Sequence, residues 1–188
     1  MLLRLILVFT LLTASTQVLA DAVDINLSND VAQFQYLAPM GQVGQGKSEF
    51  HMGFLYNDSN NILGDMGLLV KNNAGNADIL SGGIGGKVVV ARITSNNAAA
   101  LALGGKLRYA PFADKRWGII GQVYFAPDIV TFGDADRYIQ TGVGIEYEIM
   151  PQAAAYVGYR NIKVGMKATL APDARLDEGA HIGVRIAF

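Results

Sequence analysis

The feature that most constrains this chain is an alternation of apolar residues with polar or small ones, which recurs along the sequence after residue 20. In 139–149, odd positions hold isoleucine, threonine, valine and tyrosine, and even positions hold glutamine, glycine and glutamate. A β-strand points successive side chains to opposite faces, so this period of two predicts two-faced strands. The same alternation occupies 49–56, 64–71, 101–109 and 181–188.

The polar face of these strands mixes glycines with single charges, which indicates that space on that side is limited. Hydrophobic residues make up 51% of the chain and charged residues only 16%, too few charges for an ordinary soluble surface. A transmembrane barrel turns apolar residues toward lipid and polar or small residues toward a narrow lumen. The sequence therefore predicts an all-β, antiparallel, up-and-down transmembrane β-barrel, with glycines such as Gly82–Gly86 and Gly104–Gly105 bending its strands.

Turn residues divide the chain into about ten strands, an even number as in bacterial single-chain barrels. The first two are short and 38–47 is long for a periplasmic turn, so eight strands with an N-terminal hairpin tucked against the barrel is the alternative. Short connections at 111–115 and 150–152 face longer ones at 127–136 and 167–179, which predicts that both chain ends are periplasmic. The expected strands are 22–28, 31–37, 48–57, 62–71, 78–93, 98–110, 116–126, 137–149, 153–166 and 180–188.

Residues 1–20 are typical of a secretory signal peptide, cleaved to leave a barrel domain at 21–188. Arg4 provides a short positive segment, Leu5–Leu12 an apolar one, and Val18–Ala20 small residues at the cleavage positions. The apolar run is too short and too interrupted for a transmembrane anchor. The expected location is the bacterial outer membrane.

The last strand ends on an aromatic residue, Phe188, with apolar residues at every second position before it. Outer membrane barrels commonly end in such a strand, which the barrel assembly machinery recognises. The expected partners are therefore this machinery, together with outer membrane lipid and lipopolysaccharide.

Several kinds of site are excluded or disfavoured by composition and context. The chain has no cysteine, which excludes thiolate metal sites and cysteine nucleophiles, and its net charge of −1 argues against a nucleic-acid partner. Gly41–Ser48 matches the phosphate-binding pattern GxxxxGK[ST], but an alternating strand follows where that motif requires a helix. No cofactor is expected.

Charges of both signs recur on the expected lumenal face, where pairing across strands would fill a narrow interior. His51 and His181 could join carboxylates in a metal site or an acid–base pair, but their spacing has no ligand signature, and hydrogen bonding inside the lumen is the simpler interpretation. Asp24 belongs to the same face. The candidate lumen-lining residues are Glu49, His51, Asp65, Lys71, Lys87, Lys106, Arg108, Gln140, Glu146, Glu148, Arg160, His181 and Arg185.

Two further groups are expected outside the lumen. Rings near strand ends or on lipid-facing rows should form aromatic girdles at the membrane interfaces: Tyr109, Trp117, Tyr138, Tyr147, Tyr159 and Phe188. Carboxylates in the two longer connections are expected to be solvated, or to bind divalent cations that bridge lipopolysaccharide: Asp128, Asp134, Asp136, Asp173, Asp177 and Glu178.

Segments from about residue 98 onward carry a more specific pattern: Leu101–Tyr109, Tyr124–Asp128, Phe132–Tyr138, Gly142–Tyr147, Tyr156–Arg160 and the Gly-x-x-x-Gly-x-x-x-x-Phe that ends at Phe188. This pattern resembles the YfaZ family of outer membrane proteins, and the likeness extends over essentially the whole mature chain. The resemblance implies a small, porin-like barrel of the Gram-negative outer membrane and supplies no catalytic residues.

These observations favour an integral outer membrane barrel, not an enzyme, that is either a narrow porin-like channel or a structural barrel with a charge-paired lumen. One alternative is a barrel enzyme acting on lipid or peptide at the outer surface. Another is a soluble periplasmic barrel that binds a small lipophile. The direction in which the apolar face points separates the membrane barrel from this last alternative.

Overall fold

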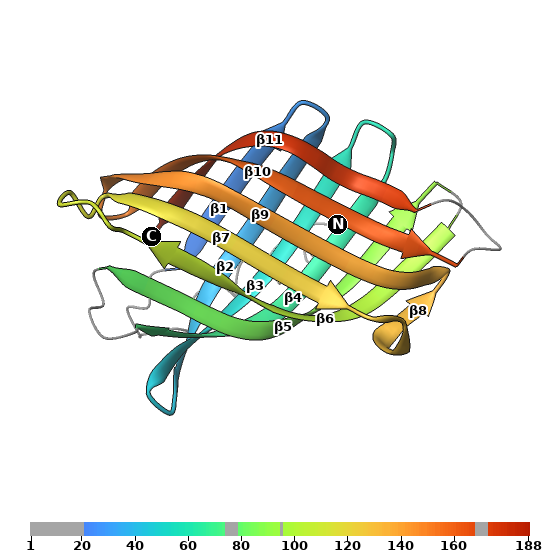
Figure 1. Cartoon of the computed structure of the whole chain (residues 1–188), viewed down its shortest axis with the longest axis horizontal. Coiled ribbons are helices and arrows are strands. Elements are labelled where there is room, and N and C mark those ends of the chain that lie inside the picture. The colour runs from blue at the N-terminus through green and yellow to red at the C-terminus, as the bar shows by residue number, and fades with distance from the viewer. Residues whose placement is uncertain (1–20, 74–78, 95, 168–172) are drawn as a thin grey trace, which may run out of the picture.

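The computed structural model describes residues 21–73, 79–94, 96–167 and 173–188, and nearly all of them lie in β-strands (Figure 1). The expected signal peptide, 1–20, lies outside the described residues. The strands are β1 (Ala22–Ser28), β2 (Val31–Val43), β3 (Gly46–Asn57), β4 (Ile62–Asn73), β5 (Leu80–Ile93), β6 (Asn96–Tyr109), β7 (Trp117–Ala126), β8 (Thr131–Gly133), β9 (Ala135–Met150), β10 (Ala153–Met166) and β11 (Ala174–Ala187).

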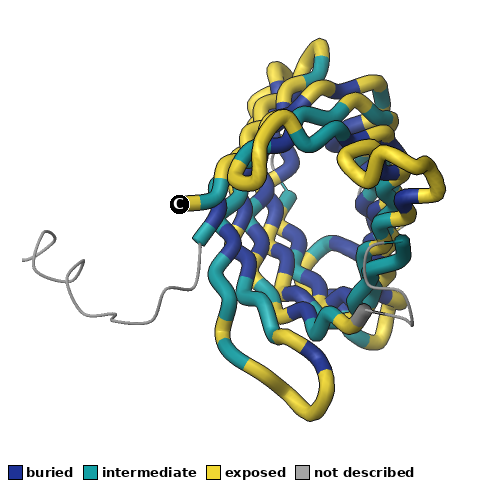
Figure 2. The backbone as a smooth tube through the Cα atoms, turned by 90° about the vertical axis from the view of Figure 1, so that its left-hand side faces the viewer, coloured by how far each residue is buried: buried dark blue, intermediate teal, exposed yellow. Residues whose placement is uncertain are grey.

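These strands form one antiparallel sheet that closes on itself. β8 is a three-residue strand paired with β6 beside the ring, so ten of the eleven strands make the wall. β1 pairs with β11 over its whole length and β5 pairs with β6, which closes the ring that Figure 2 shows. The predicted ten-stranded up-and-down barrel is confirmed, and the eight-stranded alternative is wrong because β1 and β2 belong to the wall.

The segment 38–47, expected to be a long turn, is mostly strand. β2 and β3 continue as a hairpin that pairs Val43 with Gly46, leaving a two-residue turn at Gly44 and Gln45. Gly41 has φ +100° and Gly44 has φ +60°, conformations that favour glycine. This glycine-rich stretch therefore shapes a hairpin tip, and no helix follows it to make a phosphate-binding loop.

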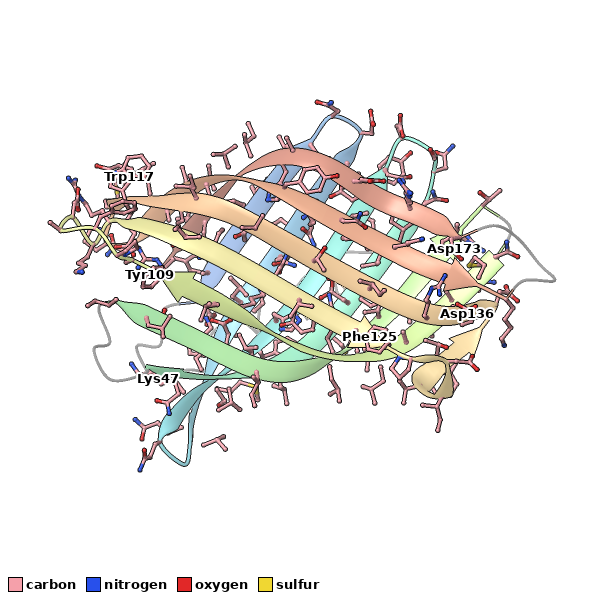
Figure 3. All side chains as sticks on the ribbon, in the orientation of Figure 1. Lys47, Tyr109, Trp117, Phe125, Asp136 and Asp173 are labelled. Carbon is pink, nitrogen blue, oxygen red and sulfur yellow. The ribbon has the colours of Figure 1, made fainter. Side chains whose placement is uncertain are left out.

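The two ends of the barrel differ. We call the end where β1 begins and β11 ends the terminal end; it also carries the Gly44–Gln45 turn. We call the opposite end, with the β7–β9 and β10–β11 connections, the loop end. The β7–β9 connection holds a short 3-10 helix, η2 (Asp128–Val130), and β8. The connection expected at 167–179 is shorter, because β11 begins at Ala174. Figure 3 shows Lys47 and Trp117 toward one end and Asp173 toward the other.

The outside of the barrel is an apolar belt, contributed by alternate residues of every strand in the ring. On β3, for example, Met52, Phe54 and Tyr56 are exposed, whereas Gly53 and Leu55 between them are buried. An exterior of this kind faces lipid, which excludes the soluble barrel with a charged exterior. The part of the chain that the structure describes contains no helix long and apolar enough to span a membrane.

Most of the rings expected in aromatic girdles lie on the outer surface. Tyr109, Trp117, Tyr159 and Phe188 are exposed, and the half-buried Tyr147 ring packs against Trp117 with centroids 4.7 Å apart. The expectation for Tyr138 is wrong. Its side chain is 1% exposed and points inward, because it has the same parity as the inward-facing Gln140.

Candidate functional site

The terminal half of the barrel encloses a cavity of about 640 Å³ that is lined by both charged and apolar residues. Its wall comes from strands all round the ring, and it combines charged, amide and glycine residues with apolar ones such as Leu37 and Leu69. The charged side chains that line it are Asp24, Lys47, Glu49, Lys71, Lys106, Arg108, Glu146, Arg160 and Arg185.

One ion-pair network crosses this cavity and is centred on Glu146. Its carboxylate accepts hydrogen bonds from Arg108 Nε at 2.8 Å and Arg185 Nη1 at 2.9 Å. Arg185 Nε also donates to Asp24 Oδ2 at 3.1 Å, and the Tyr156 hydroxyl donates to Asp24 Oδ1 at 2.5 Å. The network joins β6, β9, β11, β1 and β10, so it links half of the barrel wall through its interior.

A second buried pair lies deeper in the lumen. Arg160 Nε donates to Asp177 Oδ2 at 2.5 Å, and Arg160 Nη1 donates to Gln33. Both charged side chains are at most 3% exposed. Asp177 was expected to be a solvated loop carboxylate; it lies inside the barrel because β11 begins earlier than predicted, and it neutralises Arg160.

A third cluster surrounds Lys87, whose side chain is buried. Its Nζ donates to Gln140 Oε1 at 2.5 Å and lies 4.8 Å from the Tyr124 ring centroid. Asp65 Oδ1 is 3.8 Å from Lys87 Nζ and 3.5 Å from His51 Nε2. Neither Asp65 carboxylate oxygen has a hydrogen-bond partner, so this carboxylate is held by charge alone.

The loop-end half of the lumen is filled by apolar side chains, which we call the plug. Leu55 and Leu63 have no exposed surface, and Tyr124 and Ile162 are each 1% exposed. A water-filled path would expose such lumen-facing groups, so this packing closes the loop end. The plug consists of Val31, Leu55, Leu63, Val89, Ala91, Ile93, Ala98, Ala100, Ala102, Tyr124, Ala126, Ala135, Tyr138, Ile162, Val164, Met166 and Leu176.

Every side chain in the expected lumen-lining set lies on the inner face of the wall or at its rim. Glu49, Lys71, Lys106, Arg108, Glu146, Arg160, His181 and Arg185 border the cavity, whereas His51, Asp65, Lys87 and Gln140 are buried beside it. Glu148 lies at the terminal rim, with Oε1 3.0 Å from Arg108 Nη2. The structure does not bring the two histidines together: His51 is beside Asp65, and the His181 ring packs edge-on against Tyr156.

The plug was missed by the sequence analysis, although the sequence contains its signal. Near the loop end the alternation fades into runs that are apolar on both faces, such as Phe54–Tyr56, Val88–Ala91 and Ala98–Ala102. Such runs predict strands covered on both sides. Among the described residues, no group of three or more histidine, aspartate or glutamate side chains could hold a metal ion.

The loop-end exterior carries charges beyond the apolar belt. Asp173 accepts from Arg137 Nη2 at 2.7 Å and lies 3.0 Å from Lys163 Nζ. The hydrogen bond from Lys163, followed by that from Arg137, lowers the pKa of Asp173 to about 2. Arg175 lies directly across from Lys163 on the next strand and pairs with Glu178.

A closed antiparallel barrel with an apolar outside, a charged inside and no open sheet edge around its wall is a transmembrane β-barrel of the outer membrane class. The model of the family described as "YfaZ precursor" matches residues 2–188. The chain therefore belongs to the YfaZ family.

Solved structures with similar folds are outer membrane channels of low sequence identity. The KdgM porin is 12% identical, with 90% of this chain and 99% of that chain covered and a TM-score of 0.46. The NanC porin is 10% identical, with 90% and 97% covered and a TM-score of 0.44. The DcaP channel of Acinetobacter baumannii is 12% identical, with 94% and 55% covered and a TM-score of 0.44. No curated protein matches the sequence.

Proposed function

We propose that this protein is a porin-like barrel whose lumen is blocked at the loop end, so that it does not serve as a general diffusion pore. The plug carries this proposal. Its side chains come from nine strands of the ring, and they pack into one cluster of buried residues. The cavity would then open only toward the terminal end.

The charge arrangement supports a stable, closed interior. Arg108 and Arg185 share Glu146, and Arg160 binds Asp177, so these arginines occupy the cross-section together with their carboxylates. Separating such partners would leave single charges in a poorly solvated space, which is unfavourable. The lumen-lining residues named from the sequence would therefore act mainly as a structural network.

The proposed orientation places the terminal end in the periplasm and the loop end outside the cell. In this orientation the exterior charges at the loop end, Arg137, Lys163 and Arg175, meet the phosphates of lipopolysaccharide. The strand ending at Phe188 would engage the assembly machinery during insertion. Cleavage of a signal peptide at residue 20 belongs to the same proposal, as does the absence of enzymatic activity.

Planar-bilayer recordings test the block. The wild-type protein should give small or undetectable currents, whereas the double variant Leu63→Ala, Tyr124→Ala, which removes two plug side chains, should give measurable steps. Leu103→Ala is the matched control, because Leu103 is an outward-facing leucine on β6. Large, steady, weakly selective currents from the wild type would overturn the proposal and indicate a general diffusion porin.

A further inference from the structure

Three lysines of the cavity lie in one row across neighbouring strands. Lys47 on β3 is directly opposite Lys71 on β4, Lys71 is opposite Gly83 on β5, and Gly83 is opposite Lys106 on β6. All four residues line the cavity. We call Lys47, Lys71 and Lys106 the lysine row.

The lysine row is poorly neutralised by the protein itself. Like charges directly opposite each other on one face of a sheet are destabilising. Among the described residues, Glu49 bound to Lys71 is the only carboxylate within 4.0 Å of any of the three ammonium groups. The other cavity carboxylates, Asp24 and Glu146, are engaged by arginines.

The excess of positive charge in the cavity lies on the lysine row. The arginines of the lining are matched by carboxylates, because Arg108 and Arg185 pair with Glu146, Glu148 and Asp24, and Arg160 pairs with Asp177. The three lysines of the row face Glu49 alone, which leaves a formal excess of two positive charges on the lysine row. An anion entering this space would be attracted by all three lysines, and the attraction is stronger where water is partly excluded.

The cavity also has space for a ligand next to the row. Its volume of about 640 Å³ is in the range of small-molecule sites. A Cβ atom at Gly83 would lie only 3.0 Å from Lys71 Cγ, so the absence of a side chain at Gly83 leaves room for the Lys71 side chain inside the cavity. Lys47 lines the cavity and is exposed, and it lies near the β2–β3 hairpin toward the terminal end (Figure 3).

We propose that the lysine row is a binding site for a small organic anion with two or more negative charges, carboxylate or phosphate, that enters from the terminal end. This inference rests on the proposed function, because a lumen closed at the loop end retains a solute that an open pore would pass. The anion would supply the charge that the protein does not place between the lysines.

Isothermal titration calorimetry on the full barrel in uncharged detergent tests the site, with citrate and pyrophosphate as separate probes at low ionic strength. The wild type should bind at least one probe with a stoichiometry of one, and added salt should weaken binding. Lys106→Gln and Lys47→Gln should each reduce the affinity about tenfold or more, equivalent to about 1.4 kcal/mol. The preferred probe distinguishes a carboxylate site from a phosphate site.

Arg116→Gln is the matched control, because Arg116 is an exposed cation at the same end that pairs with Asp114 outside the cavity. Its affinity for either probe should equal that of the wild type. Lys106→Gln should also raise the resistance of the empty barrel to urea, since it removes repulsion, so lost binding cannot be ascribed to misfolding. Wild-type affinity in both lysine variants, or no saturable binding of either probe, would overturn the inference. If the wild type gave large currents and still bound the probe through the lysines, the proposal of a blocked lumen would be wrong and the anion site would stand.

Discussion

At the scale of single residues, parity along a strand decides which side chains meet inside the barrel. Glu146 and Arg108 could be assigned to the lumen from the sequence because each lies an even number of positions from other inward residues. Tyr138 could have been assigned in the same way, since Gln140 follows two positions later. Asp177 has the same parity as His181, but the last strand was predicted to begin at residue 180, which left Asp177 in a connection, whereas β11 begins at Ala174.

The Arg160–Asp177 pair gives a prediction at this scale. Arg160→Ala leaves Asp177 as an uncompensated buried charge, and should reduce the free energy of unfolding by about 3–5 kcal/mol. Arg160→Met combined with Asp177→Leu should cost much less, because both charges are removed together. Urea unfolding in lipid vesicles, followed by fluorescence of the single tryptophan, Trp117, measures both variants. Equal losses in the single and double variants would contradict the buried pair.

At the scale of strands, two facing glycines fix how closely β4 to β7 approach. Gly85 and Gly104 are directly opposite on β5 and β6. A Cβ atom at Gly85 would lie 2.0 Å from the Leu68 carbonyl oxygen, and one at Gly104 would lie 2.0 Å from that of Val123. The sequence indicated that glycines would bend these strands, but the alternation alone could not identify which glycines lie against a neighbouring backbone.

Gly104→Ala should therefore strain the wall, because a backbone carbonyl cannot move aside as a side chain can. The expected loss is about 1–3 kcal/mol of stability, with a smaller folded fraction on unboiled gels. Gly121→Ala on β7 is the control, since a Cβ atom there would be 3.9 Å from its nearest neighbour. Equal behaviour of the two alanine variants would show that the close approach at Gly104 is relaxed in the membrane.

At the scale of the whole molecule, an apolar belt surrounds an interior divided into cavity and plug. The belt and the barrel followed from the alternation, because its period is fixed by the geometry of a strand. The division of the interior into cavity and plug could not be predicted in this way. An apolar residue near the end of a strand is interpreted as lipid-facing unless the closed barrel shows that it points inward. Leu55 and Leu63 show this, since both have outward apolar neighbours in sequence.

The belt predicts where the protein is found. Cell fractionation should recover the mature chain in the outer membrane, and unboiled samples should migrate anomalously on gels, because a closed barrel resists unfolding by detergent. Deleting Phe188 should reduce the amount inserted if the final strand is what the assembly machinery recognises. Recovery of the wild type in the soluble periplasmic fraction would contradict the membrane assignment.

Cysteine accessibility tests the division of the interior most directly, because the chain has no cysteine of its own. Gln122 lines the cavity, whereas Ala102 belongs to the plug and has no exposed surface. Single variants Gln122→Cys and Ala102→Cys, folded in lipid vesicles, would be treated with a membrane-impermeant maleimide that reaches both ends of the barrel. The plug predicts rapid labelling at position 122 and essentially none at position 102. Equally rapid labelling at both positions would show a water path through the loop end and contradict the blocked lumen.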